Sequence, residues 1–173
     1  QSSSRGLGDV YKRQEIISST CESENIRHLN LLNIADLKNR IETIQKFKSG
    51  NNYSSLISII SRYSKLANKG NLEKNIYACK DKINSKLFEK KSEINVFKFL
   101  QSLENLVNTN DWEYDQLINL FEENIQVLIE IFDNKNGVMV MTEDLNLRKN
   151  RLNLLAIVRN YSLLLADFTL LNF

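Results

Sequence analysis

The side chains of this sequence that could carry chemistry are chiefly cations, and a group of them lies close to the C-terminus. Arg148, Lys149, Arg151 and Arg159 follow one another within about three helical turns. At about 100° per residue, the three arginines fall within roughly a quarter-turn sector of a helix. Guanidinium and ammonium groups on a rigid helix can neutralise phosphates, and planar Arg groups can stack on unpaired bases.

Other kinds of reactive site have no candidate residues. The histidine, His28, has no carboxylate or cysteine at metal-ligand spacing, and Cys21 and Cys79 form no close pair. Glu143 and Asp144 are adjacent carboxylates, but helix capping accounts for them more simply than acid–base catalysis does. The scattered glycines form no phosphate-binding loop. We therefore predict no catalytic residue and no metal site in this chain.

The C-terminal cations lie on a predicted amphipathic helix from about Asp144 to Phe168. Thr142, Glu143 and Asp144 precede it and suit its positive N-terminal end. Asn150 falls within the apolar positions, so a structural hydrogen bond to the loop below is its expected role. The apolar positions follow steps of three and four: Leu147, Asn150, Leu154, Ile157, Tyr161, Leu164 and Phe168.

Further helices precede this one. Apolar stripes predict helices over 31–47 and 53–67, and the turn Ser49–Asn52 between them predicts an antiparallel hairpin. A third helix is expected within 71–91, followed by helices over 92–107 and from about 112 to 121, after which Val127–Phe132 leads into the next loop. Val138–Met141 is expected to be an ordered, buried loop. On the second helix, three cations share one side, a pattern typical either of a solvated face or of a binding face: Arg62, Lys65 and Lys69.

Composition fits one all-helical domain. The 173 residues are 42% hydrophobic and 25% charged, and the net charge is only +2, so any basic surface must arise from local placement. No apolar run approaches the roughly 20 residues that span a bilayer. Unpaired cysteines fit a reducing compartment. Residues 1–14 resemble translated adapter sequence and are set apart from the expected domain, 15–173, which we expect to be a C-terminal fragment of a longer chain.

One stretch carries a family resemblance. Residues 132–171 are similar to the C-terminus of the bacterial-type glycyl-tRNA synthetase beta subunit. The similarity lies in the successive fragments FDN, VMVMTED, LR.NRL.LL, R and ADF..L. Weaker similarity extends upstream to about Ile26. Two departures occur, since Lys135–Gly137 is an insertion and Val127 replaces a common Pro. The resemblance implies an all-α antiparallel helix bundle of the DALR anticodon-binding type.

The resemblance also implies a function. It implies binding of the anticodon region of glycine tRNA, with ATP and Mg²⁺ used by an alpha subunit in a cytoplasmic alpha2beta2 ligase, and no cofactor in this part. For Arg151, a bond to a buried carboxylate or to carbonyls of the VMVM loop is an equal alternative. The residues predicted to contact tRNA are Arg148, Lys149, Arg151 and Arg159, then Arg62, Lys65 and Lys69.

Two other functions compete with this one. A helical protein-interaction module would show an exposed apolar groove and no basic patch. A small enzyme would need a pocket with perturbed ionisable groups.

Because Arg148 and Arg159 are expected to lie off the apolar stripe, replacing both with Ala is expected to leave the melting temperature nearly unchanged.

Overall fold

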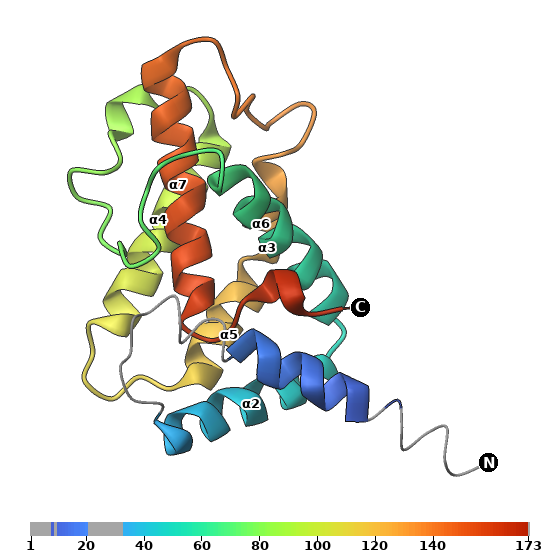
Figure 1. Ribbon diagram of the computed structural model, residues 1–173. Helices are drawn as coiled ribbons and strands as arrows, with labels where there is room; N and C mark the ends of the chain where they lie inside the picture. The colour runs from blue at the N-terminus through green and yellow to red at the C-terminus, as the bar shows by residue number, and fades with distance from the viewer. Residues whose placement is uncertain (1–7, 9, 21–32, 173) are drawn as a thin grey trace.

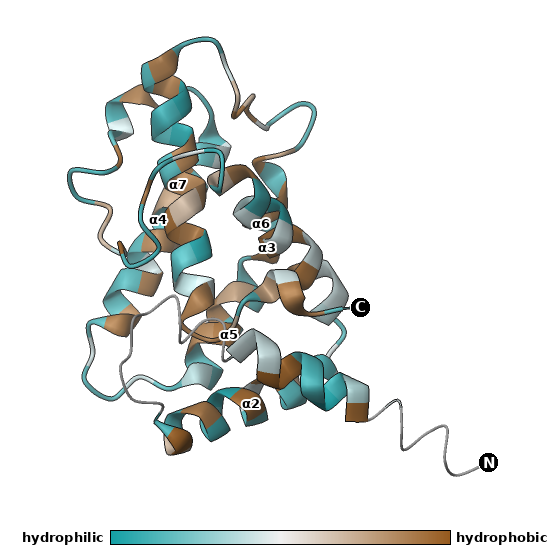
Figure 2. Cartoon of the chain, viewed as in Figure 1, coloured by the Kyte–Doolittle hydropathy of each residue, from teal (hydrophilic) through white to brown (hydrophobic). Residues whose placement is uncertain are grey.

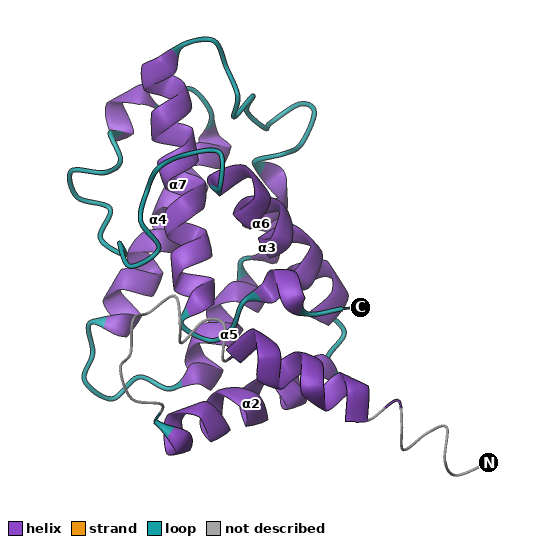
Figure 3. Ribbon diagram, in the orientation of Figure 1, coloured by secondary structure: helices purple, strands orange, loops and turns teal. Residues whose placement is uncertain are grey.

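The described part of the chain is all helical. The computed structural model describes residue 8, residues 10–20 and residues 33–172, and none of these forms a strand (Figure 3). The all-α prediction is therefore confirmed. Beyond a helical segment at 10–20, the elements are α2 (Ile34–Lys48), α3 (Tyr53–Ala67), η1 (Ser85–Leu87), α4 (Lys91–Val107), α5 (Tyr114–Glu123), α6 (Ile125–Glu130), α7 (Leu145–Leu163) and η2 (Phe168–Leu170).

The last long helix, α7, forms the centre of the fold. It runs antiparallel to α3, with which it makes its most extensive contacts, and it also packs on α4 (Figure 1). From Asn150 to Leu163 every residue of α7 is buried. The prediction of a core helix is confirmed, but the expectation of one solvated face is wrong. Hydrophilic residues occur along α7 although it is enclosed (Figure 2), so they must find partners inside the protein.

The two ends of α7 differ in how well the sequence predicted them. Asp144 is the N-cap, as expected, and its side chain accepts hydrogen bonds from the amides of Asn146 and Leu147. The helix ends at Leu163 and not at Phe168. Phe168 belongs instead to η2, where it is buried against α3. The apolar pattern extends beyond α7 to Phe168 because the turn after Leu163 and η2 also bury apolar residues, at a spacing similar to that of a helix.

Helices α2 and α3 form as predicted but do not pair as a hairpin. In Figure 1, α2 lies across the lower end of the molecule, whereas α3 rises alongside α7. The main partner of α2 is α5, to which the Tyr114 hydroxyl joins it by donating to Asp36 at 2.6 Å. A short connection allowed a hairpin, but the apolar residues of α3 are better buried by α7 and η2.

Helices α4, α5 and α6 pack on one another, and α4 and α5 confirm the helices predicted over 92–107 and 112–121. The rings of Phe99 and Phe121 meet edge to face at 5.2 Å between α4 and α5. Val127, which replaces a proline common in the family that the chain resembles, lies inside α6 with its backbone in helical conformation. Of these three helices, α4 makes the extensive contacts with α7.

The predicted third helix does not form. Residues 71–84 are turns and irregular chain, followed only by the short η1. Asn71, Asn75 and Asn84 disfavour a helix here, because short amide side chains compete for backbone hydrogen bonds. Irregular backbone must still satisfy its carbonyls, and much of that is done by polar side chains of α7.

The helical segment at 10–20 packs against the C-terminal residues of the described chain and against the end of α2. The Asp167 amide donates to the Ser19 carbonyl at 3.0 Å, and the Asn172 amide contacts the Glu15 carboxylate. Lys48 pairs with Glu15 at 3.4 Å. Residues 10–14, which resemble adapter sequence, are helical and exposed. Cys21 and His28 lie outside the described residues.

Candidate nucleic-acid interface

The first turns of α7 present two cations next to a capped helix start. The Arg148 Nε donates to the Thr142 carbonyl at 2.6 Å, and this bond fixes the Arg148 side chain against the preceding loop. Arg148 is half-buried. Lys149 is exposed and forms no ion pair with any described residue. Both therefore hold their charge near the surface at a helix start whose position Asp144 fixes.

Asparagines of α7 hold the irregular segment against the helix. The amide of Asn150 accepts from the Asn84 backbone N–H at 2.7 Å and donates to the Asn84 carbonyl at 3.1 Å. Asn153 donates to the Lys82 carbonyl at 2.7 Å. The expected structural role of Asn150 is confirmed, and its partner is the segment before η1. These bonds fix the backbone from which the Lys82 side chain extends.

Farther along α7, Arg159 and Asn160 hold the beginning of the same segment. Arg159 donates to the Leu72 carbonyl at 3.0 Å and to the Asn68 side chain at 3.1 Å, while Asn160 donates to the carbonyls of Glu73 and Ile76. Arg159 is only 4% exposed, and burial lowers its pKa from the ordinary value. The expectation that Arg159 lies off the buried face is wrong, because residues 68–76 cover the side of the helix that was expected to meet solvent.

Between this segment and the start of α7 lies an open cleft of about 1030 Å³. Four cations line it, and three of them were predicted from two separate stretches of sequence: Lys69, Arg148 and Lys149. The fourth, Lys82, was not singled out. The remaining lining residues are largely asparagines and aliphatic side chains, with Asp81 the one acidic member. Fold geometry thus brings together cations that are about 80 residues apart in the chain.

The positive charge of this region is local. Residues 62–91 contain nine Lys or Arg and three Asp or Glu, although the whole chain has a net charge of only +2. Lys74, Lys80, Lys82 and Lys86 are exposed on the irregular segment and η1. A local excess of cations beside a cleft attracts polyanions even when the total charge is near zero.

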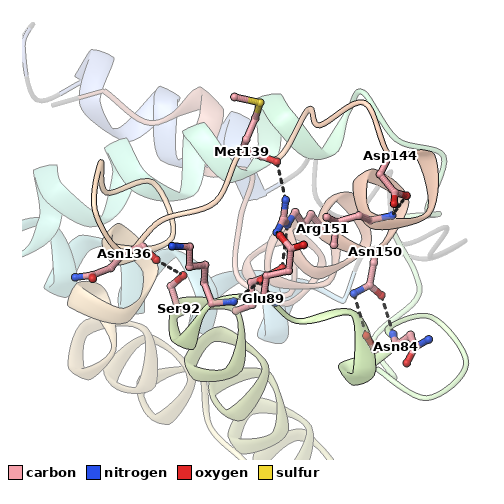
Figure 4. A network of polar contacts seen from close by, with 11 residues as sticks. Asn84, Glu89, Ser92, Asn136, Met139, Asp144, Asn150 and Arg151 are labelled. Carbon is pink, nitrogen blue, oxygen red and sulfur yellow. Dashed lines mark hydrogen bonds and ion pairs between the residues drawn. The ribbon is translucent and has the colours of Figure 1, made fainter.

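Arg151 lies in an internal network (Figure 4). Its Nε donates to Glu93 at 3.0 Å, one terminal nitrogen donates to Glu89 at 2.8 Å, and the other donates to the Met139 carbonyl at 3.0 Å. Burial alone lowers the pKa of Arg151, but the bonds to Glu93 and Glu89 outweigh it and raise the pKa above its ordinary value. The alternative in which Arg151 ties α7 to a buried carboxylate and to the VMVM loop describes this geometry.

Glu93 gives this network its fixed position. Its side chain is fully buried, and its second oxygen accepts from the backbone amides of Glu89 and Lys90 at the start of α4. Val140 is buried in the loop, as predicted, but Met139 is 73% exposed, so the prediction of a buried loop is wrong for Met139. The network therefore joins α4, α7 and the loop that precedes Arg148.

The insertion Lys135–Gly137 forms an ordered turn. The carboxylate of Asp133 accepts from the amides of Asn136 and Lys135, and these bonds lower its pKa. The Asn136 carbonyl accepts from the Ser92 hydroxyl at 2.7 Å (Figure 4). A Cβ on Gly137 would lie 2.3 Å from the Asp133 carbonyl oxygen, so only glycine fits there. The insertion is thereby attached to the start of α4.

The remaining predicted cations lie along α3. Arg62 and Lys65 are exposed on the same side of α3, which leads to Lys69 and the cleft. The Arg62 guanidinium lies over the Phe132 ring, with its carbon 4.1 Å from the ring centroid. Phe132 in turn packs against Tyr63 at 5.2 Å. Arg62 and Lys65 thus extend the cationic surface away from the cleft without lining it.

The sequence reasoning missed Lys82 and the backbone of 71–84. A local excess of Lys in this stretch was a usable signal, but a predicted helix would have spread those side chains around its axis. Among the described residues no group of three His, Cys, Asp or Glu side chains is placed to hold a metal ion. Within the same residues, no helix has the length and apolar character needed to cross a membrane.

Comparison with known proteins gives a consistent set of relatives. No protein-family model matches the chain. The chain is 31% identical over 150 residues to the glycine–tRNA ligase beta subunit of Synechocystis sp., which covers 85% of this chain and 21% of that protein. It is 36% identical over 140 residues to the beta subunit of Pseudoalteromonas atlantica and 34% identical over 135 residues to that of Streptococcus uberis.

These matches cover 80% and 76% of this chain, respectively, and 19% and 18% of the two relatives. The chain therefore spans about a fifth of the length of the curated relatives that it matches. Further matches, to Acaryochloris marina among others, carry the same protein name.

Proposed function

Because this chain belongs to the family of glycine–tRNA ligase beta subunits over the part that it shares with them, we propose that it is a noncatalytic tRNA-binding domain of such a ligase. In this proposal it binds the anticodon region of glycine tRNA. The whole ligase attaches glycine to that tRNA with ATP and Mg²⁺ in the cytoplasm, and an alpha subunit is the partner that carries the reaction. An alpha2beta2 assembly is part of the same expectation.

The observation that supports RNA binding is the convergence of Lys69, Lys82, Arg148 and Lys149 on one cleft. RNA is held chiefly by phosphate contacts, by shape and by unstacked loop bases. The cleft offers cations on rigid or tied-down backbone, with amide side chains between them. Arg151 and Arg159 support this arrangement from inside, because they fix the loop before α7 and the segment 68–76.

The interaction-module alternative gains no comparable support. Such a module would bind a partner through an exposed apolar groove. The cleft is lined by cations and asparagines together with aliphatic side chains. Its mixed, positively charged lining suits a phosphate-bearing ligand better than an apolar helix.

The proposal is tested by titrating the 173-residue chain with glycine tRNA at several salt concentrations. Replacing Lys69, Lys82 and Lys149 together with Ala is expected to weaken binding and to lower the salt dependence by about two to three phosphate equivalents. The matched control replaces Lys12, Lys38 and Lys98, which are exposed and lie outside the cleft lining.

Both triple variants lose the same charge, so long-range attraction falls equally in both. The cleft variant alone is expected to lose direct phosphate contacts. Equal weakening of both variants would show that the cleft has no special role. Absence of tRNA binding by the parent chain at low salt would contradict the proposed function itself.

A further inference from the structure

A second hollow lies on α3, away from the cleft. It has a volume of about 400 Å³ and is lined by Ser54, Ser55, Ser58, Ile59, Arg62 and Ile129. This volume falls within the roughly 300–1,000 Å³ typical of small-ligand pockets. No acidic residue lines it, and the three serine hydroxyls bond to no other described residue. Hydroxyl groups, two aliphatic side chains and one planar cation therefore face the same space.

Arg62 is held in a stacked position at the edge of this hollow. Its guanidinium carbon lies 4.1 Å from the centroid of the Phe132 ring, and Phe132 packs against Tyr63 at 5.2 Å. Tyr63 is fully buried, and its hydroxyl donates to the Leu128 carbonyl at 2.8 Å. The stack is thus anchored in the core and ends in an exposed guanidinium plane, the kind of group on which an unpaired base stacks.

The hollow and the cleft are connected by one face of α3. At about 100° per residue, Ser55, Ser58, Arg62 and Lys65 lie within roughly 80° of the helix circumference. Ser55 and Lys65 are about 15 Å apart along the axis, and Lys69 continues the row into the cleft. This face bears hydroxyls at one end and cations at the other, and α3 rises toward the start of α7 (Figure 1).

We propose that the hollow on α3 receives one unstacked nucleoside of a single-stranded RNA segment, whose base stacks on Arg62 and whose phosphates follow Lys65 and Lys69 toward the cleft. The inference rests on the proposed RNA-binding function and adds a separate site to it. The base face meets the guanidinium plane, the serine hydroxyls can exchange hydrogen bonds with the ribose or the base edge, and Ile59 and Ile129 give apolar contact.

The first test is Arg62→Lys, which keeps the charge and removes the planar surface. Titrated with glycine tRNA, this variant is expected to bind about fivefold more weakly at every salt concentration, with an unchanged salt dependence. Lys65→Ala is the contrasting variant, because it removes one phosphate contact and is expected to lower the salt dependence by about one equivalent. Parent-like affinity of Arg62→Lys would overturn the stacking proposal.

The second test fills the hollow through Ser58→Leu, at an exposed helical position where Leu is compatible with α3. Ser58→Leu is expected to weaken tRNA binding about fivefold without changing the salt dependence of binding. If Arg62→Lys alters the melting temperature, Ser58→Leu is the variant that tests whether the hollow is occupied. Unchanged binding by Ser58→Leu would show that nothing occupies the hollow. If the cleft variant weakens binding while neither α3 variant does, only this inference fails and the proposed function stands.

Discussion

Three arginines of α7 lie in one sector of the helix but have different surroundings. Arg148 is half-buried against the Thr142 carbonyl, whereas Arg151 and Arg159 are 3% and 4% exposed. Helical periodicity places these side chains correctly around the axis. It does not show which parts of that sector other segments cover, and here residues 68–84 and the start of α4 cover most of it.

Arg159→Ala is expected to destabilise the chain by about 2–3 kcal/mol, because the Leu72 carbonyl and the Asn68 side chain lose their buried donor. Lys149→Ala, at an exposed position on the same helix, is expected to change stability by no more than about 0.5 kcal/mol. Urea unfolding followed by circular dichroism measures both. The expected loss of stability in Arg159→Ala replaces the earlier expectation that a double variant of Arg148 and Arg159 melts like the parent. Equal urea midpoints for Arg159→Ala and Lys149→Ala would support that earlier expectation instead.

The Arg151–Glu93 pair gives a second prediction at this scale. Arg151→Met leaves a buried carboxylate without its cation and is expected to cost about 3–5 kcal/mol. Adding Glu93→Gln removes the stranded charge, so the double variant is expected to lose less than the sum of the two single losses. A double-mutant cycle of urea unfolding measures the difference. Strict additivity would mean that the two side chains do not stabilise each other.

At the scale of elements, α7 and the irregular segment 68–84 depend on each other. The helix has polar residues on sides that become buried, and the segment has carbonyls that no helix of its own satisfies. The polar side chains of α7 donate hydrogen bonds to the carbonyls of the segment, and the segment covers those side chains from solvent. The start of α7 adds Arg148 and Lys149, two of the four cations that line the cleft, so its N-terminal cap affects both stability and the proposed binding surface.

Asp144→Ala is expected to cost about 1 kcal/mol, because the amides of Asn146 and Leu147 lose their acceptor. Glu143→Ala is the matched control, since Glu143 is exposed and its side chain bonds to no described residue. Urea midpoints of the two variants give the comparison, and hydrogen exchange of the first-turn amides is expected to accelerate only in Asp144→Ala. Equal midpoints and equal exchange would exclude a capping role.

At the scale of the whole molecule, the core encloses several groups that ionise at alkaline pH. Burial raises the pKa of Cys79 from 9.0 to about 12. The pKa of Tyr53 rises from 10.0 to about 12, chiefly through burial and to a smaller extent through the negative charge of Glu15. Burial also raises the pKa of Tyr63 and Tyr161. Their neutral forms are therefore favoured in the folded chain.

The folded chain is expected to lose stability as the pH rises above about 9. In the unfolded chain these groups release protons near their ordinary pKa values, so the unfolded state binds fewer protons than the folded state across this range. The stabilisation is complete below pH 9 and declines toward about pH 12. Urea unfolding at pH 8, 9.5 and 10.5 measures it, and Cys79→Ala, which removes one such group, is expected to give a shallower decline. A constant free energy of unfolding from pH 8 to 10.5 would contradict this view of the core.

The sequence by itself determined the fold class, most helices, the start of α7 and the family. These features depend on local chemistry: a short acidic side chain caps a helix, and periodic apolar residues favour a helix with a buried side. Leu154, predicted as core, is fully buried. The sequence also named Lys69, Arg148 and Lys149, which line the cleft, because cations beside helix ends need no distant partner to be recognised.

Only the tertiary structure decided the rest. It placed α2 against α5, left 71–84 irregular, buried Arg151 and Arg159, and brought Lys69 and Lys82 to the start of α7. Each of these depends on contacts between residues distant in sequence. A buried arginine and a solvated one have the same local pattern, and the difference between them lies in which carbonyls and carboxylates the fold brings within hydrogen-bonding distance.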